Sequence, residues 1–142
     1  MLTWTTYGSW LQGDERGYVK DSRILGGDKE LVDVCEKLQK GHAVRLGHNE
    51  KDIVRRAILD EAERIGQTIE ALAVCNNHIH VVARYFTEPI GQTVSRFKNV
   101  ASSALRKRGR DGRVWTRGFD KRFCFSQEDL VRRIQYVENH NQ

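Results

Sequence analysis

Two histidines separated by one residue, His78 and His80, have the residue type and spacing of a metal-binding pair. Successive side chains of a β-strand point to opposite faces, so on a strand both imidazoles would project from one face, about 7 Å apart. Neutral imidazole is the commonest side-chain ligand of metal ions. The same spacing also fits two polar side chains on the solvent face of an antiparallel sheet, and the rest of the chain has to decide between these interpretations.

A tyrosine near the end of the sequence, Tyr136, lies where a core residue would not be expected. The segment that starts at Ser126 predicts a capped helix. Its apolar face carries Leu130, Val131, Ile134 and Val137. Tyr136 lies roughly 150° from the centre of that face, and His140 follows one turn later. A phenol and a metal-binding group can therefore approach the same point, although an ordinary surface tyrosine is the alternative interpretation.

The positive charge of the chain is concentrated in its second half. The formal net charge is +5, and residues 76–142 hold 13 basic and 6 acidic side chains. Lysines and arginines interleaved with aromatic residues are typical of surfaces that bind phosphates and stack unpaired bases. A solvated helix face followed by a basic loop is the alternative interpretation. The candidate nucleic-acid-binding residues are Arg96, Lys98, Arg106, Lys107, Arg113, Trp115, Arg117, Lys121 and Arg122.

Length and composition restrict the class of protein. A chain of 142 residues predicts a single domain over residues 1–142 that can bury a core without cross-links. Cys35, Cys75 and Cys124 are odd in number and form no CxxC pair, which argues against a disulfide framework or a structural zinc site. No apolar run approaches the roughly 20 residues that cross a bilayer, and no export signal begins the chain. We therefore expect a cytoplasmic protein with no membrane partner.

The elements that must position these groups follow from hydrophobic periodicity. Apolar runs predict strands at 2–7, 68–75 and 78–85, with shorter ones at 114–116 and 122–125. Helical spacing predicts helices at 50–65, at 90–108 and from 126 onward, and a weak one at 29–39. Asn49 is the expected cap of the first strong helix, and Asn76-Asn77 the turn of a hairpin. This order predicts an α+β, ferredoxin-like (RRM-like) sandwich, with an antiparallel sheet and its helices on one face.

Five segments in this order extend over most of the chain and carry a resemblance to a known family. They are residues 2–11 together with 13–17, then 71–82, 97–98, 114–118 and 134–137. In these segments the chain resembles the HUH single-tyrosine transposases, specifically the REP-associated tyrosine transposases related to small insertion-sequence enzymes. Five ordered segments are far more specific than the histidine triplet alone.

The resemblance implies a metal-dependent enzyme that cleaves and rejoins single-stranded DNA. It makes His78 and His80 ligands of Mg²⁺ or Mn²⁺, and Tyr136 the nucleophile that forms a 5′-phosphotyrosine intermediate with a free 3′-hydroxyl. The implied substrate is DNA with hairpin-forming repeats. The third ligand in related enzymes is often a glutamine on the tyrosine's helix; here His140 is the candidate, with Asn139 beside it. A monomer and a homodimer both stay open.

Two other functions are compatible with the same residues. A non-catalytic ferredoxin-like module could bind single-stranded nucleic acid, with the histidines merely polar. A replication initiator or relaxase would use the same chemistry on another substrate, but such enzymes are usually larger. Tyr136 separates the first alternative from an enzyme, because a binding module has no need of a phenol beside a histidine.

Overall fold

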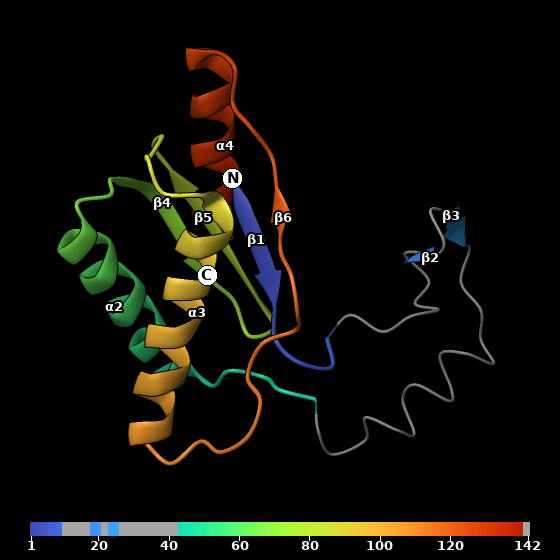
Figure 1. Ribbon diagram of the computed structural model, residues 1–142, viewed down its shortest axis with the longest axis vertical. Helices are drawn as coiled ribbons and strands as arrows, with labels where there is room; N and C mark the ends of the chain where they lie inside the picture. Colours follow the sequence, from blue (N-terminus) through green and yellow to red (C-terminus); the bar gives the residue numbers. More distant parts are fainter. Residues whose placement is uncertain (10–17, 21–22, 26–42, 141–142) are drawn as a thin grey trace.

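A computed structural model describes residues 1–9, 18–20, 23–25 and 43–140 of the chain (Figure 1). The elements, in order, are β1 (Leu2–Thr5), β2 (Tyr18–Lys20), β3 (Arg23–Leu25), α2 (His48–Ile65), β4 (Ile69–Val74), β5 (His78–Ala83), α3 (Ile90–Lys107), β6 (Asp120–Lys121) and α4 (Gln127–Asn139). The weak helix predicted at 29–39 lies outside the described residues. None of the described helices has both the length and the apolarity to cross a bilayer.

Four strands form an antiparallel sheet in the order β4-β5-β1-β6. The connection β1-α2-β4-β5-α3-β6 is the strand–helix–strand–strand–helix–strand arrangement of ferredoxin-like folds, so the predicted fold class is confirmed. In the register of the sheet, Thr3 lies opposite His80 and Thr5 opposite His78. β2 and β3 pair with each other in a separate two-stranded sheet.

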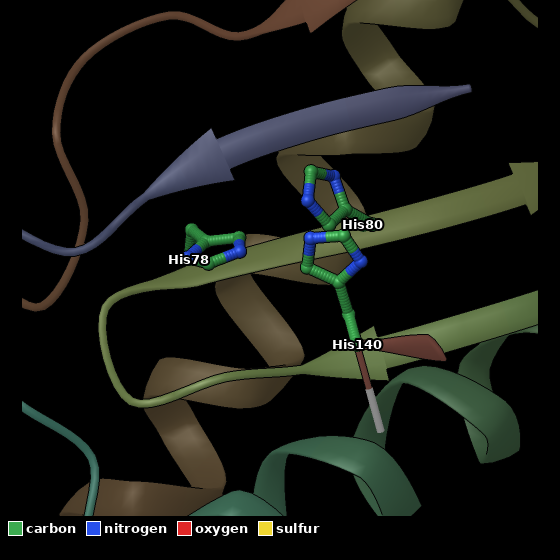
Figure 2. Close-up of side chains that lie close together, drawn as sticks. All are labelled: His78, His80 and His140. Atoms are coloured by element: carbon green, nitrogen blue, oxygen red, sulfur yellow. The ribbon is translucent and has the colours of Figure 1, made fainter. Parts of the chain in front are cut away.

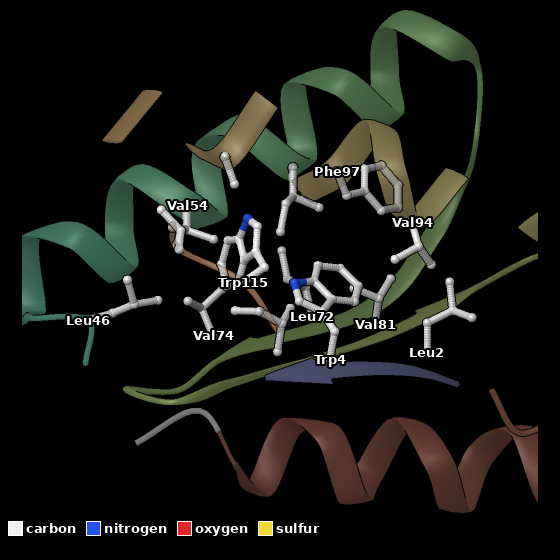
Figure 3. Close-up of a cluster of buried hydrophobic side chains, with 14 of the residues drawn as sticks. Leu2, Trp4, Leu46, Val54, Leu72, Val74, Val81, Val94, Phe97 and Trp115 are labelled. Carbon is white, nitrogen blue, oxygen red and sulfur yellow. The ribbon is translucent and has the colours of Figure 1, made fainter. Parts of the chain in front are cut away.

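The larger hydrophobic core lies between the sheet and the helices α2 and α3 (Figure 3). Trp4 is at its centre, stacked on Phe97 with 6.5 Å between ring centroids and edge-on to Trp115 at 6.2 Å. Ile79 and Val81 enter this core from β5. Because side chains alternate along a strand, the histidines of β5 must face the other side of the sheet.

The helix α4 packs on that other side, which departs from the predicted placement of all helices on one face (Figure 3). Its Val137 packs against a second, smaller cluster that includes Ala71, Ala73 and Val82 of β4 and β5. The small alanine side chains let the helix approach the sheet. A strand with both faces covered is expected to have a continuous apolar sequence, as Ala71 to Val74 does. That run was the sequence signal for a second helical layer.

Three local predictions also differ from the structure. The N-cap of α2 is Gly47, whose N–H donates to the Glu50 carboxylate at 3.0 Å, and Asn49 is already inside the helix. Residues 114–116 contribute only a single bridge, between Thr6 and Trp115. The predicted strand at 122–125 is wrong, because pairing with β1 ends where the Arg122 N–H donates to the Met1 carbonyl at 2.8 Å.

Candidate metal and tyrosine site

Three histidines converge on the sheet face that α4 covers. His78 and His80 open β5 immediately after the Asn76-Asn77 turn, and His140 caps the C-terminal end of α4. Figure 2 shows the three imidazoles turned toward a common point from these two elements. Ring centroids are 4.7 Å apart for His78 and His80, 4.9 Å for His80 and His140, and 6.0 Å for His78 and His140. Their candidate ligand atoms all lie within 4.8 Å of one another, so the cluster could hold a metal ion.

Two of the histidines have a defined tautomer because Nδ1 is held by a neighbouring oxygen. The Nδ1 of His140 lies 2.7 Å from the carbonyl oxygen of Tyr136, to which it can only donate. The Nδ1 of His78 lies 2.7 Å from the side-chain Oδ1 of Asn77. A proton on Nδ1 leaves the lone pair on Nε2, which is the usual arrangement of metal-binding imidazoles. Asn77 therefore orients a ring as well as forming the turn, a role that the sequence analysis missed.

His80 is the buried member of the cluster, and its Nδ1 lies 2.9 Å from the hydroxyl of Thr3 on the adjacent strand. Burial, followed by the positive charges that His78 and His140 would carry, lowers the pKa of His80 to about 4. The ring is therefore neutral above about pH 5 and can offer a lone pair to a cation. Sequence analysis missed Thr3 because it lies 77 residues from His80 in the chain.

Tyr136 lies beside the histidines, as the helical periodicity predicted. Its ring centroid is 4.4 Å from that of His140 and 5.5 Å from that of His80. The side chain is 44% exposed, so a large ligand can reach the phenol from solvent. Val131, predicted to lie on the apolar face of the same helix, is instead exposed.

The donor set of the cluster could hold a metal ion. The cluster contains three imidazoles and no carboxylate among the described residues. Imidazole nitrogen suits transition metals, whereas Mg²⁺ prefers oxygen ligands and keeps much of its water.

The basic residues predicted to bind nucleic acid do not form one surface around this cluster. Arg96, Arg106 and Lys107 are exposed on α3, which packs on the face of the sheet opposite the histidines. Lys121 ends the edge strand β6, and Arg122 directly follows it, so both lie two strands away from β5. Lys121 lies opposite Leu2 and so shares the core face of the sheet, whereas Arg122 pairs with Asp120 at 3.2 Å, which lies opposite Thr3 on the histidine face.

Two further candidates for nucleic-acid binding, Trp115 and Lys98, make contacts that stabilise the fold. Trp115 is 7% exposed, packs against Trp4, and donates its indole N–H to the carbonyl of Lys98 at 3.0 Å. The prediction that Trp115 stacks on a base is wrong, since its ring is inside the core. The ammonium group of Lys98 donates to the carbonyls of Thr116 at 3.0 Å and Gly118 at 2.7 Å, and burial lowers its pKa. Lys98 thereby holds the turn that precedes β6.

The remaining two arginines lie in the connection between α3 and β6. The guanidinium carbon of Arg113 lies 4.7 Å from the centroid of the Tyr7 ring, and its Nε donates to the carbonyl of Trp115 at 2.9 Å. Arg117 is exposed in the same connection. Arg113 therefore braces the loop, whereas Arg117 is available to a partner at the surface.

Comparisons with known proteins give one finding of low similarity. No protein-family model and no curated protein matches the chain. Three chains of solved structures match it, among them a crystal structure from Deinococcus radiodurans R1 that is provisionally named a transposase. That match covers 99% of this chain and 88% of the other, with 19% sequence identity and a TM-score of 0.44. Similarity at this level carries no conclusion about function.

Replacing Thr3 with valine is expected to weaken Mn²⁺ binding by about 10- to 100-fold, as is typical when a group that orients a metal-binding histidine is lost. Valine keeps the branched shape but cannot hydrogen-bond to Nδ1 of His80. Titration of the protein with Mn²⁺, followed by the electron paramagnetic resonance of the free ion, measures this affinity directly.

Thr5 provides the matched control, because it lies on the same strand and face but has no hydrogen bond from its hydroxyl to a histidine among the described residues. Thr5→Val should bind Mn²⁺ like the parent, and Thr3→Ser should restore most of the affinity. Unchanged affinity in Thr3→Val would show that the Thr3 hydroxyl does not orient His80.

Proposed function

We propose that this protein is a metal-dependent enzyme that cleaves and rejoins single-stranded DNA with hairpin-forming repeats, using Tyr136 as nucleophile. The observation that carries the proposal is the position of a solvent-accessible phenol next to three converging histidines, with 4.4 Å between the ring centroids of Tyr136 and His140. A metal site alone would fit many functions. The adjacent tyrosine favours covalent phosphoryl transfer.

In the proposed cleavage step the Tyr136 oxygen attacks a phosphorus atom of the strand. The new bond joins this oxygen to phosphorus, the bond to the 3′-oxygen breaks, and that oxygen takes up a proton from solvent as the phenol loses one. The products are a 5′-phosphotyrosine and a free 3′-hydroxyl. Rejoining is the reverse displacement, in which a 3′-hydroxyl attacks the phosphotyrosine and releases Tyr136 unchanged.

The residues around Tyr136 have separate tasks in this scheme. His78, His80 and His140 would hold the Mn²⁺ or Mg²⁺ ion, which when bound supplies Lewis-acid stabilisation of charge on the scissile phosphate. Thr3 and Asn77 fix two of these rings. The backbone of Tyr136 also accepts from His140, so the nucleophile and one ligand are held in register on the same helical turn.

Exposed positive charge near the sheet edge supports a strand that approaches from the side of β6. α4 packs on β4 and β5, whereas the exposed Arg122 directly follows β6 at the other edge of the sheet, where it pairs with Asp120 at 3.2 Å. Arg133 lies on α4 three residues before Tyr136 and is half-buried. Phosphate contacts from such residues give affinity without sequence preference.

A direct test uses a fluorescently labelled library of single strands, each with a hairpin and randomised flanks, incubated with the protein and Mn²⁺. We expect a protein–DNA adduct that survives denaturing electrophoresis, and we expect EDTA to abolish it. Sequencing the DNA attached to the protein would identify the cleaved site. DNA binding with no adduct under any divalent metal would instead favour the non-catalytic binding module.

A further inference from the structure

A large groove lies toward the end of the sheet at which β5 ends. Its volume is ≈ 1110 Å³, and Ala83 at the end of β5 is part of its lining, whereas His78 is at the start of that strand. The groove is bordered by the ends from which α3 and α4 both start (Figure 1). Pockets for small molecules typically measure about 300–1,000 Å³, so this groove is slightly larger than that range.

Three aromatic side chains of the groove are turned to solvent. Tyr85 is 92% exposed, Phe125 88% and Phe123 57%. The rings of Phe123 and Phe125 have centroids 6.1 Å apart and are tilted by 41°. Exposed aromatic rings gathered at one site mark a surface that binds a partner, because leaving them in water is unfavourable. Phe123 and Phe125 both lie in the segment 122–125, which was predicted to be a strand and is not one in the structure.

The charges around these rings favour a polyanion. The acidic groups of the groove are already paired, Glu70 with Arg84, and Glu88 with Arg96. Lys121 pairs with no carboxylate in the part of the chain that the structure describes, and its ammonium nitrogen lies 5.9 Å from the centroid of Phe123. A cation beside exposed aromatic faces is the combination that holds unstacked bases and their phosphates.

We infer that this groove binds unpaired bases of the DNA strand that Tyr136 cleaves, an inference that rests on the proposed function. The helix α4 links the two sites, because its residues Gln127, Leu130 and Ile134 line the groove, and Tyr136 lies nine residues after the first of these and two after the last. Nine helical residues span about 14 Å. At the duplex rise of about 3.4 Å per nucleotide this is at most about four nucleotides, and a more extended single strand covers it with fewer. The bases in the groove therefore lie within about four nucleotides of the cleaved phosphodiester.

In this arrangement, bases bound in the groove would fix the position of the DNA strand relative to Tyr136. Aromatic faces stack on any base, so the groove would require a base at the correct distance from the cut without requiring a particular one. The identity of the cut site would then come from other contacts, and the groove would hold the strand so that one phosphate faces Tyr136.

The test measures binding of full-length Tyr136→Phe protein, with Mn²⁺, to strands in which one nucleotide at a time is abasic. We expect abasic substitution of one or two nucleotides, within about four of the cut position, to weaken binding by about 5- to 100-fold. Adding Phe123→Ala and Phe125→Ala should weaken binding of the intact strand by a similar factor and remove the sensitivity to those abasic positions.

Phe119→Ala is the matched control, because Phe119 is also exposed in the segment after α3 but does not line the groove. It should leave the abasic profile unchanged. A flat abasic profile, or one that Phe123→Ala and Phe125→Ala do not alter, would overturn the inference. A change of oligomeric state in those variants without a change in DNA affinity would also overturn it, and would assign the groove to a second copy of the chain.

The two proposals fail in different ways. If the parent forms a covalent adduct but the abasic profile is flat, the groove inference is wrong and the proposed function stands. If the abasic profile is as expected but no adduct forms, the groove binds single strands and the proposed catalysis is wrong.

Discussion

Replacing Tyr136 with phenylalanine is expected to reduce covalent attachment to DNA by at least about a thousandfold, to the background of the assay. The substitution removes only the hydroxyl oxygen that would form the bond to phosphorus. Among the described residues that hydroxyl makes no hydrogen bond to the protein, and the side chain is half-exposed, so we expect the free energy of unfolding to change by less than about 0.5 kcal/mol. Adduct formed with a labelled hairpin strand, separated on a denaturing gel, gives the measurement.

Tyr85→Phe serves as the control for this substitution. Tyr85 is also an exposed tyrosine, but it lies beyond the other end of β5 and would keep its aromatic ring in the groove. It should form adduct at the rate of the parent. If Tyr136→Phe formed as much adduct as the parent while Tyr85→Phe formed none, Tyr85 would be the nucleophile. If both variants formed as much adduct as the parent, neither tyrosine would be the nucleophile.

The position of Tyr136 was predictable because the relevant information is local. Helical periodicity between residues 126 and 140 places Tyr136 away from the apolar face and His140 one turn beyond it, independently of what the helix packs on. The same holds for His78 and His80, since the asparagine turn fixes where β5 begins and strand alternation then fixes their common face.

The side of the sheet on which α4 lies depends on non-local packing. A helix's own sequence shows that it has an apolar face but does not show which surface covers that face. Here the information is in β4, where Ala71 and Ala73 alternate with Leu72 and Val74, so that both faces of the strand are apolar. Placing α4 on the histidine face is also what the site requires, because Tyr136 and His140 could not otherwise reach β5.

Basic and aromatic residues near one another in sequence were not equivalent in the structure. Trp115 and Phe123 are eight positions apart in the same basic segment, yet Trp115 is in the core and Phe123 is exposed. The difference comes from the bridge between Thr6 and Trp115, a contact between distant parts of the chain. Composition could therefore not separate the aromatic residues of this region that are exposed from those that stabilise the fold.

Removing both strand histidines, with His78→Ala and His80→Ala together, is expected to abolish cleavage while leaving most of the affinity for DNA. Two of the three imidazoles of the cluster are lost, so Mn²⁺ should no longer bind at concentrations that saturate the parent. DNA affinity should persist because it would come mainly from phosphate and stacking contacts elsewhere. Adduct yield and equilibrium binding to the same labelled strand measure the two effects separately.

The stability of the protein provides a second readout that does not depend on DNA. Mn²⁺ at a hundredfold excess over its dissociation constant should stabilise the parent by about 2.7 kcal/mol, which corresponds to a rise in Tm of roughly 5–10 °C that EDTA reverses. The double variant should show no such rise. His48→Ala is the control, since His48 is exposed on α2, on the other side of the sheet, and it should keep both the Mn²⁺ shift and cleavage.

His80 is buried, so its replacement also removes packing and the partner of Thr3, and the melting temperature in EDTA measures that structural cost. A double variant that is folded in EDTA, binds DNA and neither responds to Mn²⁺ nor cleaves would support a metal centre that acts in catalysis. Equal loss of DNA binding and cleavage, with a collapse of the melting temperature in EDTA, would show that the pair stabilises the sheet. If the double variant still cleaved DNA, Tyr136 would act without the metal ion that the histidines are proposed to hold, and the histidines would have no part in catalysis.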